Sequence, residues 1–416
     1  MYESIREGVA ANASRISVGR NLYPPSKVIQ QHVQRHLRRL TESSRISEYE
    51  SHDDLVGCAL VADLLNMYLE RSDIVPADVF FTQGSQEGIS LMCGYAAQLG
   101  LEALLPLPTY YSFEQSSLRW GMPVAGYYRS DGAIWWAHNP CTRIFQALVV
   151  PNAITGTMFP VPDDGGSRLG SQVAFTLIDC VFQLGAFDNH SVLTQQTVEL
   201  VRKFRLEHSA LLFTVSKDLS LPALRAGILL TKNRDAMRFA KADRFERLYS
   251  ISPFSAPIVA LYLSVLLLNK CPSCQTYNDV FRAFQNAGVE FLREPEAQEI
   301  MTHITEMTRR SQNNLDLLLH GTFPLELTRD FVPIAGFSVF PRVLQGFTSS
   351  GKFIDWIKTM GINQGLKINP NYLFGAKPEI WEELYPADYR IRVNLSADTD
   401  ELRRSLRQLK RGMNLS

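Results

Sequence analysis

The chain reads Thr214-Val-Ser-Lys-Asp-Leu-Ser-Leu-Pro-Ala-Leu-Arg-Ala-Gly227 around a single lysine, and this stretch is the most informative part of its 416 residues. A threonine stands three positions before Lys217, Ser216 stands directly before it, and Arg225 follows eight positions later. A lysine amine can act as a nucleophile, whereas hydroxyl groups and a forked guanidinium are suited to hold a phosphate. The stretch therefore combines a reactive amine with an anion site.

A second signal lies upstream, where the apolar run Phe175-Thr-Leu-Ile-Asp-Cys180 contains a carboxylate, Asp179, at its end. A lysine amine, phosphate-binding hydroxyls, an arginine and a carboxylate that can pair with a pyridine nitrogen are the groups that pyridoxal phosphate (PLP) needs from a protein. The sequence therefore predicts a PLP site built around Lys217.

The segment Gly84-Ser85-Gln86 is a further candidate for binding an anion. It follows an expected strand at residues 79–81 and opens an expected helix that runs to about residue 99. Free backbone N–H groups and the helix dipole favour an anion there, and Ser85 adds a hydroxyl. Alone, the segment is typical of a helix N-cap. Beside Thr214, Ser216 and Arg225 it favours a phosphate site.

The composition restricts the partners. Lys plus Arg and Asp plus Glu both number 42, so the formal net charge is zero and offers no field to attract nucleic acid or an anionic membrane. The most apolar run, residues 257–268, is too short to span a bilayer, and the first residues lack the pattern of a signal peptide. We therefore expect a cytoplasmic protein with a small-molecule substrate, and neither nucleic acid nor a membrane as partner.

Other kinds of site find little support. Cys271 and Cys274 form a C-x-x-C without a second pair of ligands, and His52-Asp53-Asp54 is a compact polar cluster too small for a metal site, so no metal is expected. Six cysteines are too few for a disulfide-dense scaffold in a chain of this length. No G-x-S-x-G appears, and no G-x-G-x-x-G follows a strand, which argues against a hydrolase and a dinucleotide fold.

Between about residues 79 and 230, short apolar runs alternate with helical stretches. This pattern is typical of an α/β fold, in which helices cover a mostly parallel sheet in three layers. The expected strands lie at residues 79–81, 101–107, 145–150, 175–178, 210–215 and 226–230.

The remainder of the chain predicts a smaller α+β domain. Its expected elements are a helix at residues 295–320, strands at 337–341, 365–369 and 389–395, and a closing helix at 399–410. We expect a PLP-binding large domain over residues 50–290, and a small domain formed by residues 1–49 and 291–416.

The motifs and their order resemble those of the fold-type I PLP-dependent enzymes of the class I/II aminotransferase family, from about Gly19 to the C-terminal helix. The resemblance implies that Lys217 forms a Schiff base with PLP and shuttles the substrate's α-proton, and that Asp179 pairs with the pyridine nitrogen. It also implies that several further residues contact the cofactor phosphate or ring: Ser85, Gln86, Tyr110, Thr214, Ser216 and Arg225. Tyr49 matches a tyrosine that reaches the phosphate from the other subunit, which implies a homodimer with the active site at the subunit interface.

The same resemblance indicates how a substrate is held. In Tyr389-Arg-Ile-Arg-Val-Asn-Leu-Ser396, Arg392 aligns with the arginine that binds the α-carboxylate of an amino acid. Two parallel hydrogen bonds from a guanidinium would fix both the charge and the orientation of that carboxylate. Arg390 should share the same strand face and is an alternative. Gly19 matches a glycine that lets the backbone approach the substrate.

Two departures from the family pattern concern the phenolic oxygen of the cofactor. The family's Asn-Pro-x-Asn-Pro-Thr-Gly is replaced by Val150-Pro-Asn-Ala-Ile-Thr-Gly156, so that Ala153 takes the place of the cofactor-binding asparagine and Asn152 lies one position away. The usual tyrosine of Asp-x-x-Tyr is Phe182. Without these donors, the imine at Lys217 should be more basic and stay protonated near neutral pH. Either Asn152 or water supplies the missing bond, or the chemistry itself is altered.

The sequence thus predicts an aminotransferase of amino acid metabolism that acts on an α-amino acid. A second hypothesis is a PLP enzyme of a natural-product biosynthesis pathway that performs decarboxylative oxidation, cyclisation or β/γ-replacement, which the altered pocket around the phenolic oxygen would favour. A third is a binding protein that retains the fold without catalysis. Intact Lys217, Asp179 and Arg225 argue against the third.

Overall fold

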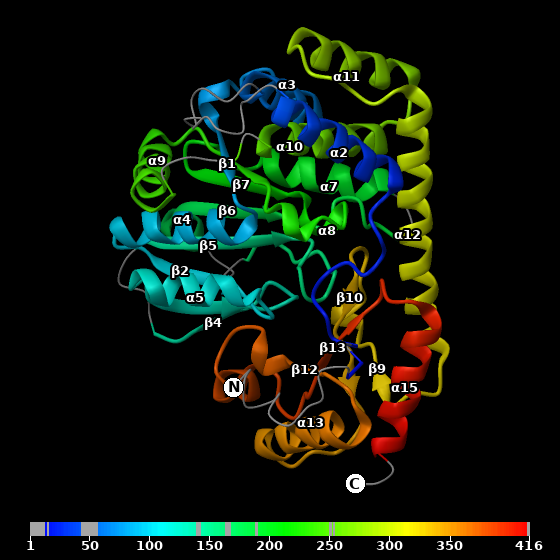
Figure 1. Ribbon diagram of the computed structural model, residues 1–416. Coiled ribbons are helices and arrows are strands. Elements are labelled where there is room, and N and C mark those ends of the chain that lie inside the picture. The colour runs from blue at the N-terminus through cyan, green and yellow to red at the C-terminus, as the bar shows by residue number, and fades with distance from the viewer. Residues whose placement is uncertain are drawn as a thin grey trace.

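The computed structural model describes residues 13–14, 16–42, 57–138, 143–162, 168–187, 190–248, 252 and 254–413. A large sheet, with helices on both faces, occupies one part of the molecule, and smaller sheets with their own helices occupy the other (Figure 1). The fold is therefore α/β with a smaller α+β part, as expected from the sequence.

The large sheet has eight strands. Their order, from one edge to the other, is β1 (Val79–Thr82), β8 (Gly227–Leu230), β7 (Ser209–Thr214), β6 (Val173–Cys180), β5 (Ile144–Val150), β2 (Glu102–Pro106), β3 (Val124–Tyr128) and β4 (Ile134–Trp136). The five strands from β7 to β3 run parallel, while β8, β1 and β4 pair antiparallel with their neighbours. All residues of β5 and β7 are buried, which explains why they read as continuous apolar runs.

Helices cover both faces of this sheet (Figure 1). On one face, the apolar α10 (Ser255–Lys270) packs against α3 (Cys58–Leu69) and α7 (His190–Arg202). On the other face, α4 (Ser85–Gln98) packs against α5 (Tyr111–Trp120) and α9 (Arg234–Leu248). The run expected to form a buried helix lies within α10, whose residues are almost all buried. No helix in the described ranges is both apolar and long enough to cross a bilayer.

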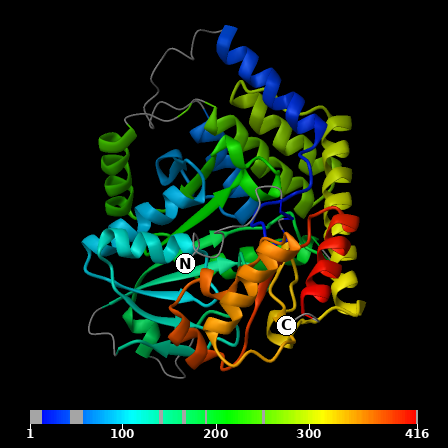
Figure 2. The same cartoon turned by 60° about the horizontal axis from the view of Figure 1, so that its bottom comes forward.

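The small α+β part follows α11 (Cys274–Asn286) and the long helix α12 (Glu294–His320). It contains a three-stranded sheet, β10 (Ser338–Val339), β13 (Ile391–Asn394) and β12 (Asn369–Pro370), and a two-stranded sheet of β9 (Leu325–Glu326) and β11 (Arg342–Val343). Its helices are α13 (Ser350–Gln364), α14 (Pro378–Leu384) and α15 (Thr399–Met413). Figure 2 shows α12 along one side of the molecule with α15 beside it.

The N-terminal segment joins this small part. The Ser14 N–H donates to Gly365 O, and the Asn394 N–H donates to Ile16 O. The helix α2 (Lys27–Glu42) packs against α12. These contacts agree with grouping the N-terminal segment with the C-terminal part, whereas domain boundaries at residues 50 and 290 stay a prediction.

The structure differs from the expected elements in two places. The expected strand at 365–369 is wrong for most of its length, because Gly365, at φ 63°, ends α13 and the strand β12 begins only at Asn369. The strands β3 and β4 were not expected. Tyr127 and Trp135 pair across these two strands.

Candidate active site

Lys217 and Asp179 lie at the same edge of the large sheet. Asp179 is near the end of β6, and Lys217 follows the neighbouring parallel strand β7 in the short helix α8 (Val215–Asp218). The carboxyl ends of parallel strands commonly form binding sites because their loops gather at one edge. The two most informative sequence signals are thus brought together by strand order.

The Lys217 amine has an apolar and aromatic surrounding. Its Nζ atom lies 5.0 Å from the centre of the Phe182 ring and 5.4 Å from that of Tyr110. Burial lowers the pKa of Lys217 to about 8, and the neighbouring Asp179 carboxylate opposes this effect. A lysine with a pKa near neutrality has a substantial unprotonated fraction, so it is suited to act as a nucleophile and a base.

The turn that carries Lys217 is held from several sides. The Thr214 hydroxyl caps α8 by accepting from the Ser216 N–H, and Asn21 Nδ2 donates to Lys217 O at 3.0 Å. The buried Asp218 carboxylate accepts from the Tyr262 hydroxyl at 2.6 Å and from the Gln183 N–H at 3.1 Å. Sequence reasoning missed the pair of Asp218 and Tyr262, since 44 positions separate them and neither belongs to a motif.

Asp179 is a buried carboxylate with an unsatisfied oxygen. It is 1 % exposed, and its Oδ1 atom has no hydrogen-bond partner. Burial raises its pKa to about 7, although the nearby Lys217 lowers it. Leaving a buried polar atom unpaired is costly, so such atoms indicate a missing partner. A cationic ring nitrogen is a partner that would stabilise the ionised form.

A candidate phosphate site lies between α4 and the segment before β8. The N-cap of α4 is Gly84, at φ 77°, and a Cβ atom there would lie 3.0 Å from Nη2 of Arg225. Ser85 is therefore the first residue of the helix and does not cap it with its side chain. Arg225 is fixed by a bond from Nη2 to Gln83 O at 2.9 Å, and Gln86 donates to the Tyr111 hydroxyl at 2.8 Å.

The two hydroxyls before Lys217 interact with each other. Thr214 is 4 % exposed, and its Oγ1 lies 3.1 Å from Oγ of Ser216 and 3.2 Å from Ala226 O. The hydroxyl of Thr214 thus has local partners, and its contact with a phosphate stays a prediction.

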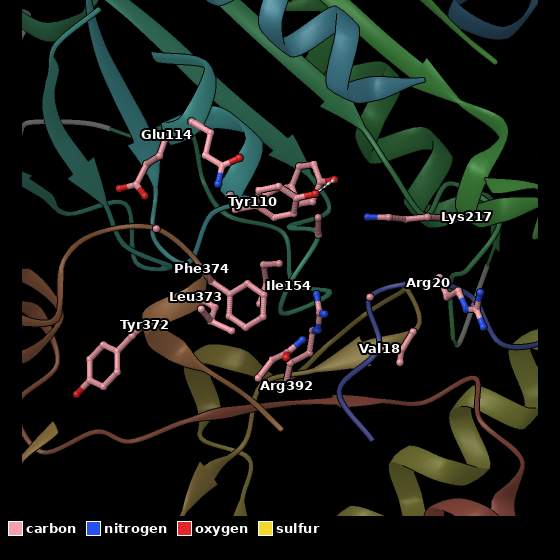
Figure 3. A pocket seen from close by; sticks show the side chains of 16 residues that line it. Val18, Arg20, Tyr110, Glu114, Ile154, Lys217, Tyr372, Leu373, Phe374 and Arg392 are labelled. Atoms are coloured by element: carbon pink, nitrogen blue, oxygen red, sulfur yellow. Dashed lines mark hydrogen bonds between the residues drawn. The ribbon is translucent and has the colours of Figure 1, made fainter. Parts of the chain in front are cut away.

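A cavity of about 690 Å³ opens in front of Lys217 (Figure 3). It is lined by parts of both the sheet region and the small α+β part. The residues that line it are Val18, Gly19, Arg20, Tyr110, Tyr111, Glu114, Gln115, Ala153, Ile154, Lys217, Asn369, Tyr372, Leu373, Phe374, Gly375 and Arg392. Of the predicted site residues, the fold therefore brings Gly19, Tyr110, Lys217 and Arg392 to one cavity.

Arg392 lines this cavity and is held by several contacts. Its Nε and Nη2 atoms donate to Ser17 O at 3.1 and 2.7 Å, and its guanidinium lies 4.7 Å from the centre of the Phe374 ring. A Cβ atom at Gly19 would lie 2.7 Å from its Nη1. These contacts fix the guanidinium so that it points upward from β13 into the cavity (Figure 3).

Arg390 does not share this position. It is 2 % exposed, pairs with Asp388 at 2.7 Å and donates to Phe340 O and the Thr328 hydroxyl. Arg390 immediately precedes β13, which begins at Ile391, and it is not among the residues that line the cavity. The alternative of a substrate-binding Arg390 is thereby removed.

Asn152, one of the two expected sources of a hydrogen bond to the phenolic oxygen, is bonded to backbone groups in this structure. Its Nδ2 atom donates to Pro108 O at 2.8 Å, and its Oδ1 atom accepts from the N–H groups of Ile154 and Thr155. One N–H of its amide and its Oδ1 atom are thus bonded to backbone groups of two loops. Ala153, the next residue, lines the cavity instead.

Phe182, which stands where the family pattern has a tyrosine, lies beside the Lys217 amine. Its ring centre lies 5.0 Å from the Lys217 Nζ atom, and its backbone has a positive φ of 55°. Neither Ala153 nor Phe182 can donate a hydrogen bond from its side chain.

Two other expectations concern Tyr49 and metal binding. Tyr49 and the cluster at residues 52–54 lie outside the described residues. Within the described ranges, no group of His, Cys, Asp and Glu side chains could hold a metal ion.

Comparison with known proteins gives similarity of structure but not of sequence. A scan against models of protein families finds no match, and a search of curated sequences finds none either. An aspartate aminotransferase variant of Thermus thermophilus superposes with a TM-score of 0.67 at 14 % identity, covering 99 % of this chain and 94 % of that one. The aromatic aminotransferase of Pyrococcus horikoshii gives a TM-score of 0.65 at 14 % identity, covering 100 % and 99 %.

A third similar structure is a protein of Methanococcus jannaschii, described as similar in its active site to kynurenine aminotransferases. It gives a TM-score of 0.66 at 15 % identity and covers 97 % of this chain and 92 % of that one. The chain has the fold of these aminotransferases. The likeness extends over the whole molecule, and at this level of identity it concerns the fold.

The described residues fit PLP. Asp179 offers an unpaired carboxylate oxygen, Lys217 a half-buried amine, and Gly84 a helix N-terminus against which Arg225 lies without any intervening side chain. Tyr110 presents an aromatic ring beside the amine. These groups match the charges and shape of the cofactor's ring nitrogen, aldehyde and phosphate.

Proposed function

We propose that this protein is a PLP-dependent enzyme that acts on an α-amino acid, with transamination as its reaction. The observation that carries the proposal is that Lys217 and the fixed Arg392 line one cavity, while the buried Asp179, whose Oδ1 atom has no hydrogen-bond partner, interacts electrostatically with Lys217. When bound, PLP supplies an electron sink for the bonds at the substrate's α-carbon.

The protein's own residues would have distinct tasks. Lys217 would attach the cofactor covalently. Once the substrate has displaced the Lys217 amine from the cofactor, its Nζ atom would hold and return the α-proton. Asp179 would keep the ring nitrogen protonated. Ser85, Gln86, Thr214, Ser216 and Arg225 would bind the phosphate, and Tyr110 would contact the ring. Arg392 would bind and orient the α-carboxylate, with Gly19 leaving room for it.

A second candidate function has its own support. Ala153 and Phe182 line the region around Lys217 where the family has hydrogen-bond donors. Removing such donors changes the electronic state of a bound cofactor, and this favours a non-transaminating reaction such as decarboxylative oxidation, cyclisation or β/γ-replacement. The proposed amino acid metabolism would then be biosynthetic.

Absorbance spectroscopy separates these candidates. The purified protein is mixed with PLP, and amino acids are added one at a time without a keto-acid acceptor. Conversion of the cofactor to its amine form, with no further turnover, supports transamination. Turnover that regenerates the starting spectrum without an acceptor supports the second candidate. Failure to bind PLP at all would overturn both and favour a binding protein.

We also propose that the enzyme is a homodimer, on the ground that Tyr49 matches a residue that acts across a subunit interface. Sedimentation equilibrium of the PLP-loaded protein tests this. A monomer with full activity would contradict the proposed role of Tyr49.

A further inference from the structure

The cavity has an apolar wall on the side away from Lys217. Ile154, Leu373 and Phe374 stand between Tyr110 and Arg392, whereas the Lys217 amine enters from the opposite direction (Figure 3). If Arg392 binds the α-carboxylate of a substrate, the substrate's side chain therefore contacts this apolar wall. Each methylene buried on such a wall improves binding by about fourfold.

Two of the three positive charges of the cavity already have a proposed role. Among the sixteen residues that line it, the cations are Lys217, Arg392 and Arg20. Arg20 is exposed, and its guanidinium points away from Arg392 and the apolar wall (Figure 3). The wall therefore carries no cation that would pair with a second carboxylate of the substrate.

The far end of this wall carries a negative charge instead. Glu114 lines the cavity, and its Oε1 atom accepts hydrogen bonds from the Ala376 N–H at 2.7 Å and from the Tyr127 hydroxyl. These two bonds tie the carboxylate, which belongs to α5, to β3 and to the segment before α14. Like charges at close range in a site partly shielded from water repel more strongly than in bulk water.

We propose that the site takes α-amino acids with an apolar side chain that bears no negative charge, and that it discriminates against dicarboxylic amino acids. Ile154 and Leu373 would contact the side chain, and Glu114 would repel a second carboxylate. This inference rests on the proposed function, because it places the α-carboxylate on Arg392.

Two simple acids test the wall without catalysis. Hexanoate and adipate have the same six-carbon chain and differ only in the terminal carboxylate. Calorimetric titration of both into the cofactor-free protein should give at least about tenfold tighter binding of hexanoate, from the apolar contact and the repulsion together. The same titrations with the PLP-loaded protein check that the preference persists.

Variants identify the residues responsible. Glu114→Gln keeps the Oε1 acceptor and removes the charge, so it should strengthen adipate binding about fivefold and leave hexanoate unchanged. Leu373→Ala should weaken hexanoate about tenfold and affect adipate less. Arg20→Ala is the control and should leave the ratio of the two affinities unchanged.

The outcomes separate this inference from the proposed function. The inference alone is overturned if adipate binds as tightly as hexanoate. It is also overturned if the ratio of the two affinities changes in Arg20→Ala and stays the same in Glu114→Gln. If neither acid binds the wild-type protein, the cavity is not a carboxylate site, and the proposed role of Arg392 falls as well. The inference is supported if the wild-type protein binds hexanoate more tightly than adipate and if Glu114→Gln reduces the ratio of these two affinities.

Discussion

A Cβ atom at Gly19 would lie 2.7 Å from Nη1 of Arg392. The distance is shorter than real Cβ contacts allow, so any larger residue at position 19 must displace the guanidinium. The glycine and the arginine are 373 positions apart, yet the N-terminal segment that contains Ser17 and Gly19 also accepts two hydrogen bonds from that guanidinium. The position of the arginine therefore depends on the absence of a side chain at Gly19.

Gly19→Ala should weaken substrate binding without unfolding the protein, because the displaced group is the end of a flexible side chain. A misplacement of about 1 Å at a positioning residue can cost up to about a hundredfold in kcat/KM. Steady-state kinetics and the melting temperature measure the two effects. Gly346→Ala is the matched control, since nothing lies within 4 Å of a Cβ atom there. Equal effects of the two variants would contradict the account.

Arg392→Ala and Arg390→Ala should fail in different ways. Removing Arg392 should raise KM and lower kcat/KM at least about thirtyfold, since truncating one member of a buried charge pair costs about 2 kcal/mol or more. Removing Arg390 leaves Asp388 without its buried partner, which should destabilise the fold by about 3–5 kcal/mol while the folded fraction keeps its KM. Urea unfolding and initial rates distinguish the two. An Arg392→Ala variant with the KM of the wild type would contradict the proposed role of Arg392.

Asp179→Asn should change how the stability of the cofactor-free protein depends on pH. Burial raises the pKa of Asp179 from 3.8 to about 7, so between these values the folded protein keeps a proton that the unfolded chain releases. Stability therefore falls as the pH rises through this window, by an amount on the order of 4 kcal/mol. Asparagine cannot ionise and avoids this loss.

Urea unfolding of both proteins at pH 5 and pH 8 measures the part of this effect that lies above pH 5, about 3 kcal/mol. The wild type should lose stability relative to Asp179→Asn on going to pH 8. The buried Asp218, whose pKa burial raises to about 6, is present in both proteins and cancels in the comparison. A difference that stays the same at both pH values would show that Asp179 is ionised at pH 5 already.

Phe182→Tyr should lower the pH at which the lysine-bound cofactor loses its imine proton. A hydroxyl at this position would donate to the phenolic oxygen and reduce its attraction for that proton. In the wild type the imine should stay protonated near neutral pH, and an absorbance titration of the PLP-loaded proteins measures both. Phe281→Tyr on the exposed face of α11 should change nothing. A wild-type transition well below pH 7 would mean that another donor replaces the missing ones.

The sequence predicted the residues that belong to local strings. Lys217, Asp179 and Gly84 each stand at the end of a buried strand or the start of a helix, and parallel strands bring such ends to one edge. The fold class follows from the same alternation of strands and helices. These features depend on a few neighbouring residues and are therefore visible in the chain itself.

Other parts of the site depend on contacts between distant segments and could not be predicted. Glu114 is fixed by Ala376 and Tyr127, and Asp218 by Tyr262, and none of these pairs has a sequence signature. The choice between Arg390 and Arg392 depended on the partners of Arg390, which are Asp388, Phe340 and Thr328 and which a strand pattern does not reveal.

The central claim is that Lys217 attaches PLP. Incubation with PLP, reduction with borohydride and mass spectrometry of the digested protein test it directly. The account predicts a phosphopyridoxyl group on the peptide that contains Lys217, and none on the protein with Lys217→Ala. A protein that stays unlabelled, or that carries the label on other lysines to the same extent, would contradict the account.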